Sequence, residues 1–383
     1  MLTFMLSKIF NKTAQLPDKN LLVAILALII FGWILSSSAS IGHFGNYSKA
    51  INQAIYIVLG MFFGLLVLKS PLSLYKENRY WLFLITIILL AVVFSPIGKT
   101  INGSTRWIDL VAFKLQPSEI LKIVIILFVA GFLVEQEKDL RRPWMGFIKT
   151  LVIITVPGVL LLLESDFGAT IIVVATVLAM LLASGVYLKQ LFIFGGVALL
   201  FVVGLISLNP NRVERFTSFW RDDLWLNHSD KVWQTKQALV GIARGDWTGV
   251  GLGNSIQKYT KLPEPHTDMI FAIIGEETGI IGMLFVIFTF TYIMLKGFKI
   301  AKEALKDNRR YSSYVGFGIC TWLSMQFSVN IAMNLGLIPP KGFTLPLVSY
   351  GGSSIIFALI SMALLLRINM ENKADSTKRK YYV

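Results

Sequence analysis

The chain has 383 residues, of which 55% are hydrophobic and only 15% are charged, and its formal net charge is +14. Soluble domains keep apolar residues near half and charged residues near a quarter, so this composition excludes an ordinary soluble protein. In a membrane protein, an excess of Lys and Arg usually anchors cytoplasmic loops, and we therefore expect no nucleic-acid partner.

Ten apolar segments follow one another along the chain. A helix needs roughly 20 residues to cross a bilayer, and helices satisfy their own backbone groups in lipid. We predict an all-α polytopic membrane protein with about ten transmembrane helices. Residues 1–20 form a cytoplasmic tail, 21–366 a single transmembrane domain and 367–383 a basic cytoplasmic tail. The predicted spans are 21–40, 54–68, 81–97, 120–133, 151–163, 169–185, 191–206, 270–295, 314–335 and 355–366.

The distribution of Lys and Arg predicts the orientation of these spans. The loop after the eighth span is the most basic, with Lys296, Lys299, Lys302, Lys306, Arg309 and Arg310. Cytoplasmic loops collect such residues, so both termini are predicted to be cytoplasmic, in agreement with an even number of spans. The sequence Glu164-Ser165-Asp166 divides the fifth and sixth spans, and a surface turn is expected there because carboxylates are costly in mid-membrane.

Several cations lie in the predicted outer loops, against this general distribution. Arg106 precedes the fourth span, Arg212 and Arg215 follow the seventh, and Lys341 precedes the tenth. Arg and Lys at the level of the lipid head groups suit phosphate or diphosphate, because Arg offers bidentate donors. For Arg212 and Arg215, contact with the membrane's own head groups explains the residues equally well.

The outer loop at residues 207–269 is far longer than an ordinary connection, and long loops are usually functional or disordered. Its aromatic residues, Trp220, Trp225, Trp233, Trp247 and others, argue against disorder and for interfacial helices, one of them at 232–244. The glycines at 249–253 lack the preceding strand and the following lysine of a nucleotide-binding loop, so a tight turn is the better interpretation.

The end of this loop, residues 262–268, reads Leu-Pro-Glu-Pro-His-Thr-Asp and leads directly into the eighth span. Thr267 or Asp268 could be the N-cap of that helix, which the residues alone favour. Alternatively, Asp268 is a general base, because a carboxylate at the edge of an apolar body has a raised pKa. Glu276 lies about 12 Å further along the helix and is predicted to line the same cavity. Glu119 and Lys122, at i and i+3, are predicted to form a structural ion pair.

Residues 336–354 contain three prolines and four glycines, which prevent a continuous helix. Irregular backbone at membrane depth survives only inside protein or beside a water-filled cavity. This segment, with Lys341 exposed and Ser349 near its end, is therefore predicted to form part of a site.

Taken together, these stretches resemble the SEDS family, named for shape, elongation, division and sporulation. The matching residues are Asn102-Gly103 with Arg106-Trp107-Ile108, Gln116-Pro117-Ser118-Glu119, 249–258, 262–277 and 336–354. They occur in family order over nearly the whole chain, and Lys341-Gly342 before Thr344-Leu345-Pro346-Leu347 is similar to the division branch. One departure is Glu164-Ser165-Asp166, where the family often has Gln-Pro-Asp.

The resemblance implies a glycosyltransferase that polymerises lipid II into peptidoglycan strands, with undecaprenyl diphosphate leaving. It implies that Asp268 is the base, which overrides the capping interpretation. It also suggests Arg106, Arg212, Arg215 and Lys341 as diphosphate contacts, and Gln116, Glu276 and Ser349 as further substrate-binding residues. A divalent cation, Mg²⁺ or Mn²⁺, could bridge the diphosphate.

The family also implies partners and a location: membrane lipids, a class B penicillin-binding protein and other division proteins, at the septum of the bacterial inner membrane with the active site on the periplasmic side. Two rival functions remain open, a lipid II flippase and a non-catalytic scaffold of the division machinery. A flippase predicts charged residues through the full depth of the bundle, whereas here they gather on the outer face.

Overall fold

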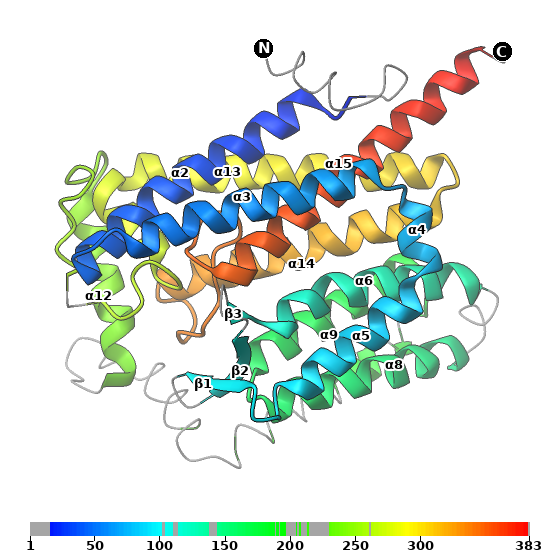
Figure 1. The fold of residues 1–383 in the computed structure, drawn as a ribbon, viewed down its shortest axis with the longest axis horizontal. Coiled ribbons are helices and arrows are strands. Elements are labelled where there is room, and N and C mark those ends of the chain that lie inside the picture. Colours follow the sequence, from blue (N-terminus) through cyan, green and yellow to red (C-terminus); the bar gives the residue numbers. More distant parts are fainter. Residues whose placement is uncertain are drawn as a thin grey trace.

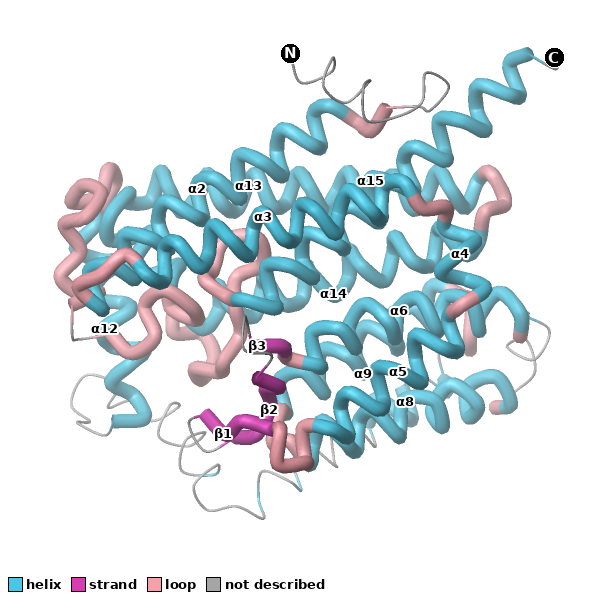
Figure 2. The backbone as a smooth tube through the Cα atoms, viewed as in Figure 1, coloured by secondary structure: helices cyan, strands magenta, loops and turns pink. Residues whose placement is uncertain are grey.

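The computed structural model describes residues 16–101, 104–109, 114–137, 144–187, 189–190, 192–196, 204, 207, 213, 230–259 and 262–381. It is an elongated bundle of helices, with a small sheet beside it and α12 at one end (Figures 1 and 2). The helices are α2 (Lys19–Phe44), α3 (Ser48–Lys69), α4 (Leu72–Glu77), α5 (Arg79–Val92), α6 (Pro117–Glu135), α8 (Met145–Leu163), α9 (Phe167–Ala183), α12 (Asp230–Gly245), α13 (Ile270–Lys306), α14 (Arg310–Asn334) and α15 (Gly352–Tyr381). The strands are β1 (Gly98–Ile101), β2 (Ser104–Asp109) and β3 (Lys114–Leu115).

The helices confirm a polytopic membrane protein. Within the described residues, α2, α3, α6, α13, α14 and α15 are long and apolar enough to cross a bilayer, and α5, α8 and α9 are shorter apolar helices. They correspond to nine of the ten predicted spans. The seventh, at 191–206, lies largely outside the residues that the structure describes.

Among the six long apolar helices of the described residues, α6 is the most buried, with 83% of its apolar stretch covered by protein, against 28% for α3. Side chains on α3, such as Val58 and Phe62, are exposed and apolar, which suits contact with lipid. Beside α6 lies α14, whose Phe327 stacks on Phe290 of α13 at 3.9 Å between ring centroids. Dispersion and close packing hold such a bundle together, because lipid is as apolar as the side chains.

A backbone break interrupts α13 at Gly279, where φ is 65° and ψ is −165°. The outer loop satisfies the polar groups that this break frees: Ile280 N–H donates to Asp246 O at 2.9 Å, and Val250 N–H to Glu276 O at 2.9 Å. A Cβ on Gly279 would collide with the backbone of Trp247, so glycine is needed both for its φ and for its size. The outer part of α13, which begins just after Asp268, is thereby a short helix of its own.

The three strands form an antiparallel sheet in the order β1-β2-β3, with Lys99 opposite Trp107 and Asp109 opposite Lys114. They join α5 to α6, and in Figure 1 they lie at the left-hand end of these two helices, below α3 and α14. This sheet was not predicted from the sequence. It places Arg106, on β2, beside the turn between α8 and α9.

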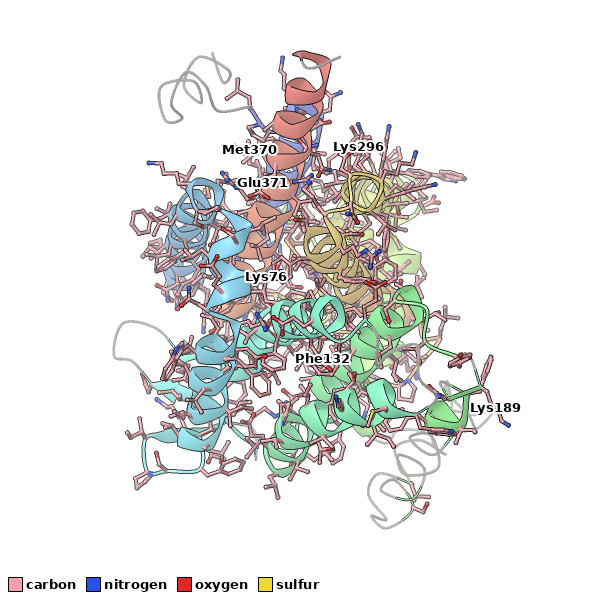
Figure 3. All side chains as sticks on the ribbon, turned by 90° about the vertical axis from the view of Figure 1, so that its right-hand side faces the viewer. Lys76, Phe132, Lys189, Lys296, Met370 and Glu371 are labelled. Atoms are coloured by element: carbon pink, nitrogen blue, oxygen red, sulfur yellow. The ribbon has the colours of Figure 1, made fainter. Side chains whose placement is uncertain are left out.

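The residue before α2 and the second half of α15 meet at the end of the bundle opposite α12. Asp18 N–H donates to Asn369 Oδ1 at 3.0 Å, and Lys296 lies 3.5 Å from the Asp18 carboxylate. Helix α15 continues without interruption past Leu366, and Glu371 pairs with Arg367 at 2.9 Å, so the first residues of the predicted tail are helical and packed. Figure 3 looks onto this end, with Lys76, Lys189 and Lys296 around the bundle.

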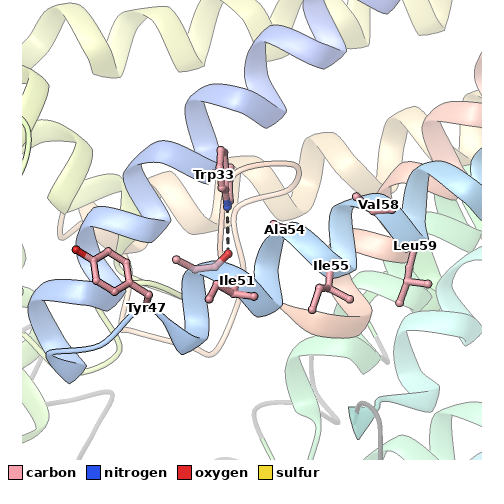
Figure 4. A pocket seen from close by; sticks show the side chains of 8 residues that line it. Trp33, Tyr47, Ile51, Ala54, Ile55, Val58 and Leu59 are labelled. Atoms are coloured by element: carbon pink, nitrogen blue, oxygen red, sulfur yellow. Dashed lines mark hydrogen bonds between the residues drawn. The ribbon is translucent and has the colours of Figure 1, made fainter.

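A groove of about 460 Å³ lies between α2 and α3 (Figure 4). At one side of the groove, Trp33 Nε1–H of α2 donates a hydrogen bond to Ala50 O of α3 at 3.2 Å. Its lining is apolar and includes none of the predicted site residues, so we assign it to the lipid-facing surface. The lining residues are Trp33, Tyr47, Ala50, Ile51, Ala54, Ile55, Val58 and Leu59.

Candidate active site

The turn at 262–269 presents Asp268 at the beginning of α13. Glu264 lies in this turn and has a φ of 50°. Its carbonyl accepts hydrogen bonds from the N–H groups of Thr267 and Met269, each at 3.3 Å. The N-cap of α13 is Met269, which makes no side-chain capping bond, and the Thr267 hydroxyl donates back to Glu264. The capping interpretation of Thr267 or Asp268 is therefore wrong.

The Asp268 carboxylate is partly buried and, within the described residues, accepts no hydrogen bond and forms no ion pair. Burial raises its pKa to about 7, because surrounding protein replaces the water that would stabilise the charge, and the like charge of Glu264 adds to the effect. A carboxylate with this pKa accepts a proton effectively near neutral pH. A Cβ placed on Gly342 would lie 3.5 Å from Asp268 Oδ2, so the irregular loop faces this carboxylate.

Two buried asparagines on α14 hold the backbone of Asp268. Asn330 Nδ2–H and Asn334 Nδ2–H both donate to Asp268 O, at 2.9 and 3.0 Å. Neither residue was predicted from the sequence, although their spacing of four residues inside an apolar span places two amides on one helix face. Buried amides in such a span need hydrogen-bond partners, and that signal was available in the sequence.

The loop at 336–354 is fastened to the Asp268 turn. Ser349, predicted to bind substrate, is 3% exposed; its hydroxyl donates to Thr267 O and accepts from Leu345 N–H, both at 2.7 Å. The next residue, Tyr350, donates its N–H to His266 O at 2.9 Å. Ser349 therefore joins the two segments. Lys341 is exposed on the same loop, one residue before Gly342.

The His266 side chain is buried against the rings of Phe44 and Tyr350, at centroid distances of 5.2 and 5.3 Å. Burial lowers the pKa of His266 to about 4, and the positive charge of Lys49 acts in the same direction. The imidazole is therefore neutral at physiological pH.

A series of polar side-chain contacts that begins on α6 supports the loop at 336–354. Lys122 lies 2.8 Å from Glu119, which confirms the predicted structural ion pair. Lys122 Nζ also donates to Gln326 Oε1 at 3.2 Å, and Gln326 Nε2 donates to Thr344 O at 3.0 Å. The Glu119–Lys122 pair therefore orients the Gln326 amide, which holds the loop at 336–354 through Thr344.

Arg106 reaches the turn between α8 and α9. Its guanidinium donates to Ser165 O at 2.6 Å and lies 3.7 Å from the Asp166 carboxylate. Glu164 is 2% exposed, and burial together with the charge of Asp166 raises its pKa to about 8. The neighbouring Gly168 packs against the ring of Phe343, so this turn borders the loop that faces Asp268.

Gln116 lies where the sheet meets α6. Its backbone N–H donates to Ser353 Oγ at 3.0 Å, and its Nε2 donates to Ser118 Oγ at 3.0 Å. The first contact joins the N-cap of α6 to the beginning of α15, and the second lies within the first turn of α6. Arg212 and Arg215, predicted as diphosphate contacts, lie outside the described residues.

Glu276, predicted to line the cavity, is fully buried and has its own donors. Its carboxylate pairs with Arg244 at 2.6 Å, accepts from Ile256 N–H at 3.0 Å and from Gln257 N–H at 3.3 Å, and contacts the Ser255 hydroxyl. Its neighbour Glu277 pairs with buried Lys258 at 2.8 Å and accepts from Ser38. Both carboxylates thus fasten the outer loop to α13.

The described residues contain no group of three or more His, Cys, Asp or Glu side chains that could hold a metal ion. Glu276 and Asp166 are engaged by cations, and Asp268 lies near the like charge of Glu264. The protein residues described here therefore do not form a Mg²⁺ or Mn²⁺ site by themselves.

Comparison with known proteins identifies the family. The model of the FtsW, RodA and SpoVE family of cell cycle proteins matches residues 19–374. The "probable peptidoglycan glycosyltransferase FtsW" of Legionella pneumophila is 39% identical over 375 residues, which cover 96% of this chain and 94% of that protein. The protein of the same name from Hahella chejuensis is 38% identical, over 94% and 92% of the two chains.

Solved structures show the same fold. A chain from a peptidoglycan synthase complex that coordinates polymerization and crosslinking aligns with a TM-score of 0.78 and 24% identity, over 93% of this chain and 98% of that one. The rod shape determining protein RodA of Thermus thermophilus aligns with a TM-score of 0.69 and 23% identity, over 93% and 97%. The resemblance to the SEDS family is thereby confirmed, and this chain belongs to the FtsW, RodA and SpoVE family of cell cycle proteins as a multi-pass bacterial membrane protein.

Proposed function

We propose that this chain is a peptidoglycan glycosyltransferase that polymerises lipid II during septal cell-wall synthesis. Its family membership and the names of relatives that cover nearly its whole length support this activity. The single structural observation behind the proposal is the Asp268 carboxylate, which has a raised pKa and stands between a rigid turn and an irregular loop.

Asp268 acts as the general base in this proposal. Its carboxylate removes the proton from the 4-hydroxyl of the acceptor GlcNAc, and that oxygen attacks C1 of the donor MurNAc. The new glycosidic C–O bond forms as the bond from C1 to the diphosphate breaks, with inversion at C1. Undecaprenyl diphosphate leaves with the electron pair, and Asp268 carries the proton until water takes it.

Cations near the loop stabilise the leaving diphosphate. Lys341 is exposed one residue from Gly342, which faces Asp268, and is our first candidate for this contact. Arg106 lies at the bordering turn, where backbone carbonyls orient its guanidinium. Arg212 and Arg215 complete the proposed set.

Mg²⁺ or Mn²⁺ would have to be bound chiefly by the substrate's own diphosphate, because the described residues offer no cluster of ligands. The proposed step uses only Asp268 and the cationic side chains. Whether the reaction requires the ion is measured by adding or chelating it in the polymerisation assay.

The proposed location follows from the distribution of charge. The end of the bundle with Lys76, Lys189 and Lys296 faces the cytoplasm together with both termini, and the Asp268 end faces the periplasm. We further propose a class B penicillin-binding protein as partner, at the division septum with other division proteins. A structurally similar chain comes from a complex that coordinates polymerization and crosslinking, which supports such a partner.

The test is chain extension of labelled lipid II by the purified full-length protein, with and without the crosslinking partner. Asp268→Asn keeps the shape of the side chain and removes the base, so polymer should disappear. Asp307→Asn, at the opposite end of α13, is the matched control and should retain activity.

The same variants separate the rival functions. A flippase transports lipid II across vesicles without extending it, and a scaffold binds its partners without doing either. Polymer formation by the wild type rules out both as the sole function. Undiminished polymer formation by Asp268→Asn would reject the assignment of the base.

A further inference from the structure

Asn330 and Asn334 lie one helical turn apart at the outer end of α14 and are both 0% exposed. Their side chains make polar contacts where the neighbouring residues of α14, such as Phe327 and Met333, are buried and apolar. A buried amide is tolerated only when its donors and acceptor are bonded, so the contacts of these two residues define what they do.

Both amides converge on one atom of the proposed base residue. Asn330 Nδ2–H and Asn334 Nδ2–H donate to the backbone carbonyl of Asp268 at 2.9 and 3.0 Å, which occupies both lone pairs of that oxygen. Asn334 in addition donates to Asn330 Oδ1 at 3.2 Å. The pair therefore fixes the backbone from which the Asp268 carboxylate projects.

Asn330 alone extends this link to the opposite side of the site. Its Nδ2 also donates to Phe343 O, on the loop that carries Lys341 and Gly342. Asn334 instead turns its Oδ1 to α13 and accepts from Ala272 N–H at 3.0 Å. One amide thus joins the base to the facing loop, whereas the other joins the base to the first turn of its own helix.

We propose that Asn330 is a positioning residue for glycosyl transfer, which holds the Asp268 backbone and the Lys341 loop at a fixed separation. This inference rests on the proposed function of Asp268. The charged group that acts on the base is Glu264 on its own turn, and Asn330 and Asn334 of α14 contribute neutral amides. Asn330 therefore acts on the reaction through geometry and adds no charge.

The test uses Asn330→Leu, which has a similar volume but no donor, in the full-length protein with fluorescent lipid II. A misplacement of about 1 Å at a reacting group costs roughly 100-fold in rate, and we expect a fall in kcat of about that size with KM nearly unchanged. Lipid II bound per protein molecule should stay the same. The midpoint of the pH–rate curve should fall, because a released carboxylate gains access to water.

Two variants serve as controls. Asn330→Asp preserves the size of the side chain but places an acceptor oxygen against two carbonyls, and we expect the same loss of kcat. Asn334→Leu leaves the bond from Asn330 to Phe343 O in place, so it should lose less kcat and more thermal stability than Asn330→Leu. In all three variants, lipid II stoichiometry separates lost activity from lost folded protein.

Two results would overturn the inference: a kcat within about threefold of wild type in folded Asn330 variants, or a loss of kcat matched by an equal loss of binding stoichiometry with an unchanged pH midpoint. Either result leaves the assignment of Asp268 intact if Asp268→Asn is inactive. If Asp268→Asn still polymerises lipid II, the proposed function itself fails, and the role of Asn330 fails with it.

Discussion

Gly342 stands directly before the carboxylate of Asp268, with the position of its absent Cβ only 3.5 Å from Oδ2. The two residues are separated by more than seventy positions in the sequence, and they meet because Ser349 and Asn330 bind the loop to the turn. Because residue 342 has no side chain, it leaves the space beside Oδ2 free of its own atoms. An acceptor hydroxyl that gives its proton to Asp268 has to enter this space.

Gly342→Ala should therefore hinder the acceptor without disturbing the fold. The added methyl makes an ordinary van der Waals contact with Asp268 and leaves less space for the sugar. One methyl group in a binding site is worth roughly tenfold or more in kcat/KM, and we expect a loss of that order. Gly158→Ala, where a Cβ meets nothing within 4 Å, is the control. Equal activity of the two variants would place the acceptor elsewhere.

The rate of polymerisation should rise with pH through a midpoint near 7, because the base is protonated and inactive below the pKa of Asp268. Glu264 raises that pKa by its like charge, so Glu264→Gln should move the midpoint to lower pH. The plateau rate at high pH should change little, since the base itself remains. The measurement is initial rate against pH for the two proteins, and an identical midpoint would show that Glu264 does not influence the base.

Glu164→Gln should stabilise the protein in alkaline solution. The pKa of Glu164 is about 8 in the folded protein and near 4.5 when exposed, so folding favours the protonated form. The resulting loss of stability begins as pH rises past 4.5 and is complete above 8. A neutral glutamine has no charge to bury and therefore avoids this loss of stability. Thermal unfolding at pH 5 and at pH 9 checks this expectation, with a gain in Tm only at the higher pH.

Gly279→Ala should destabilise the junction between α13 and the outer loop. The residue has a φ of 65°, and a Cβ there would collide with the backbone of Trp247 and Gly249. Strain of this kind costs about 1–3 kcal/mol, and the steric overlap with fixed backbone adds to it. We expect protease to cleave the outer loop faster in this variant than in Gly158→Ala. Unchanged protection would mean that the break tolerates a side chain.

The sequence alone was sufficient for the spans and for their order. Hydrophobic length is a local property, because each helix satisfies its own backbone whatever its neighbours do, and nine predicted spans appear as helices in the described residues. The i,i+3 pair of Glu119 and Lys122 is local in the same sense, since both residues lie on one helix face. Asp268 at the beginning of α13 was likewise readable from the prolines and the apolar run that follows.

Only the tertiary structure decided which polar groups meet. Glu276 looked available from its spacing, but α12 and the outer loop enclose it; Ser349 looked like a ligand of substrate, but its hydroxyl is used between two loops. Asn330 was overlooked, because its importance depends on two backbone carbonyls from segments distant in sequence. A hydrogen bond is short and directional, so the partner of a buried polar group is set by the packing of helices, which no local pattern of residues contains.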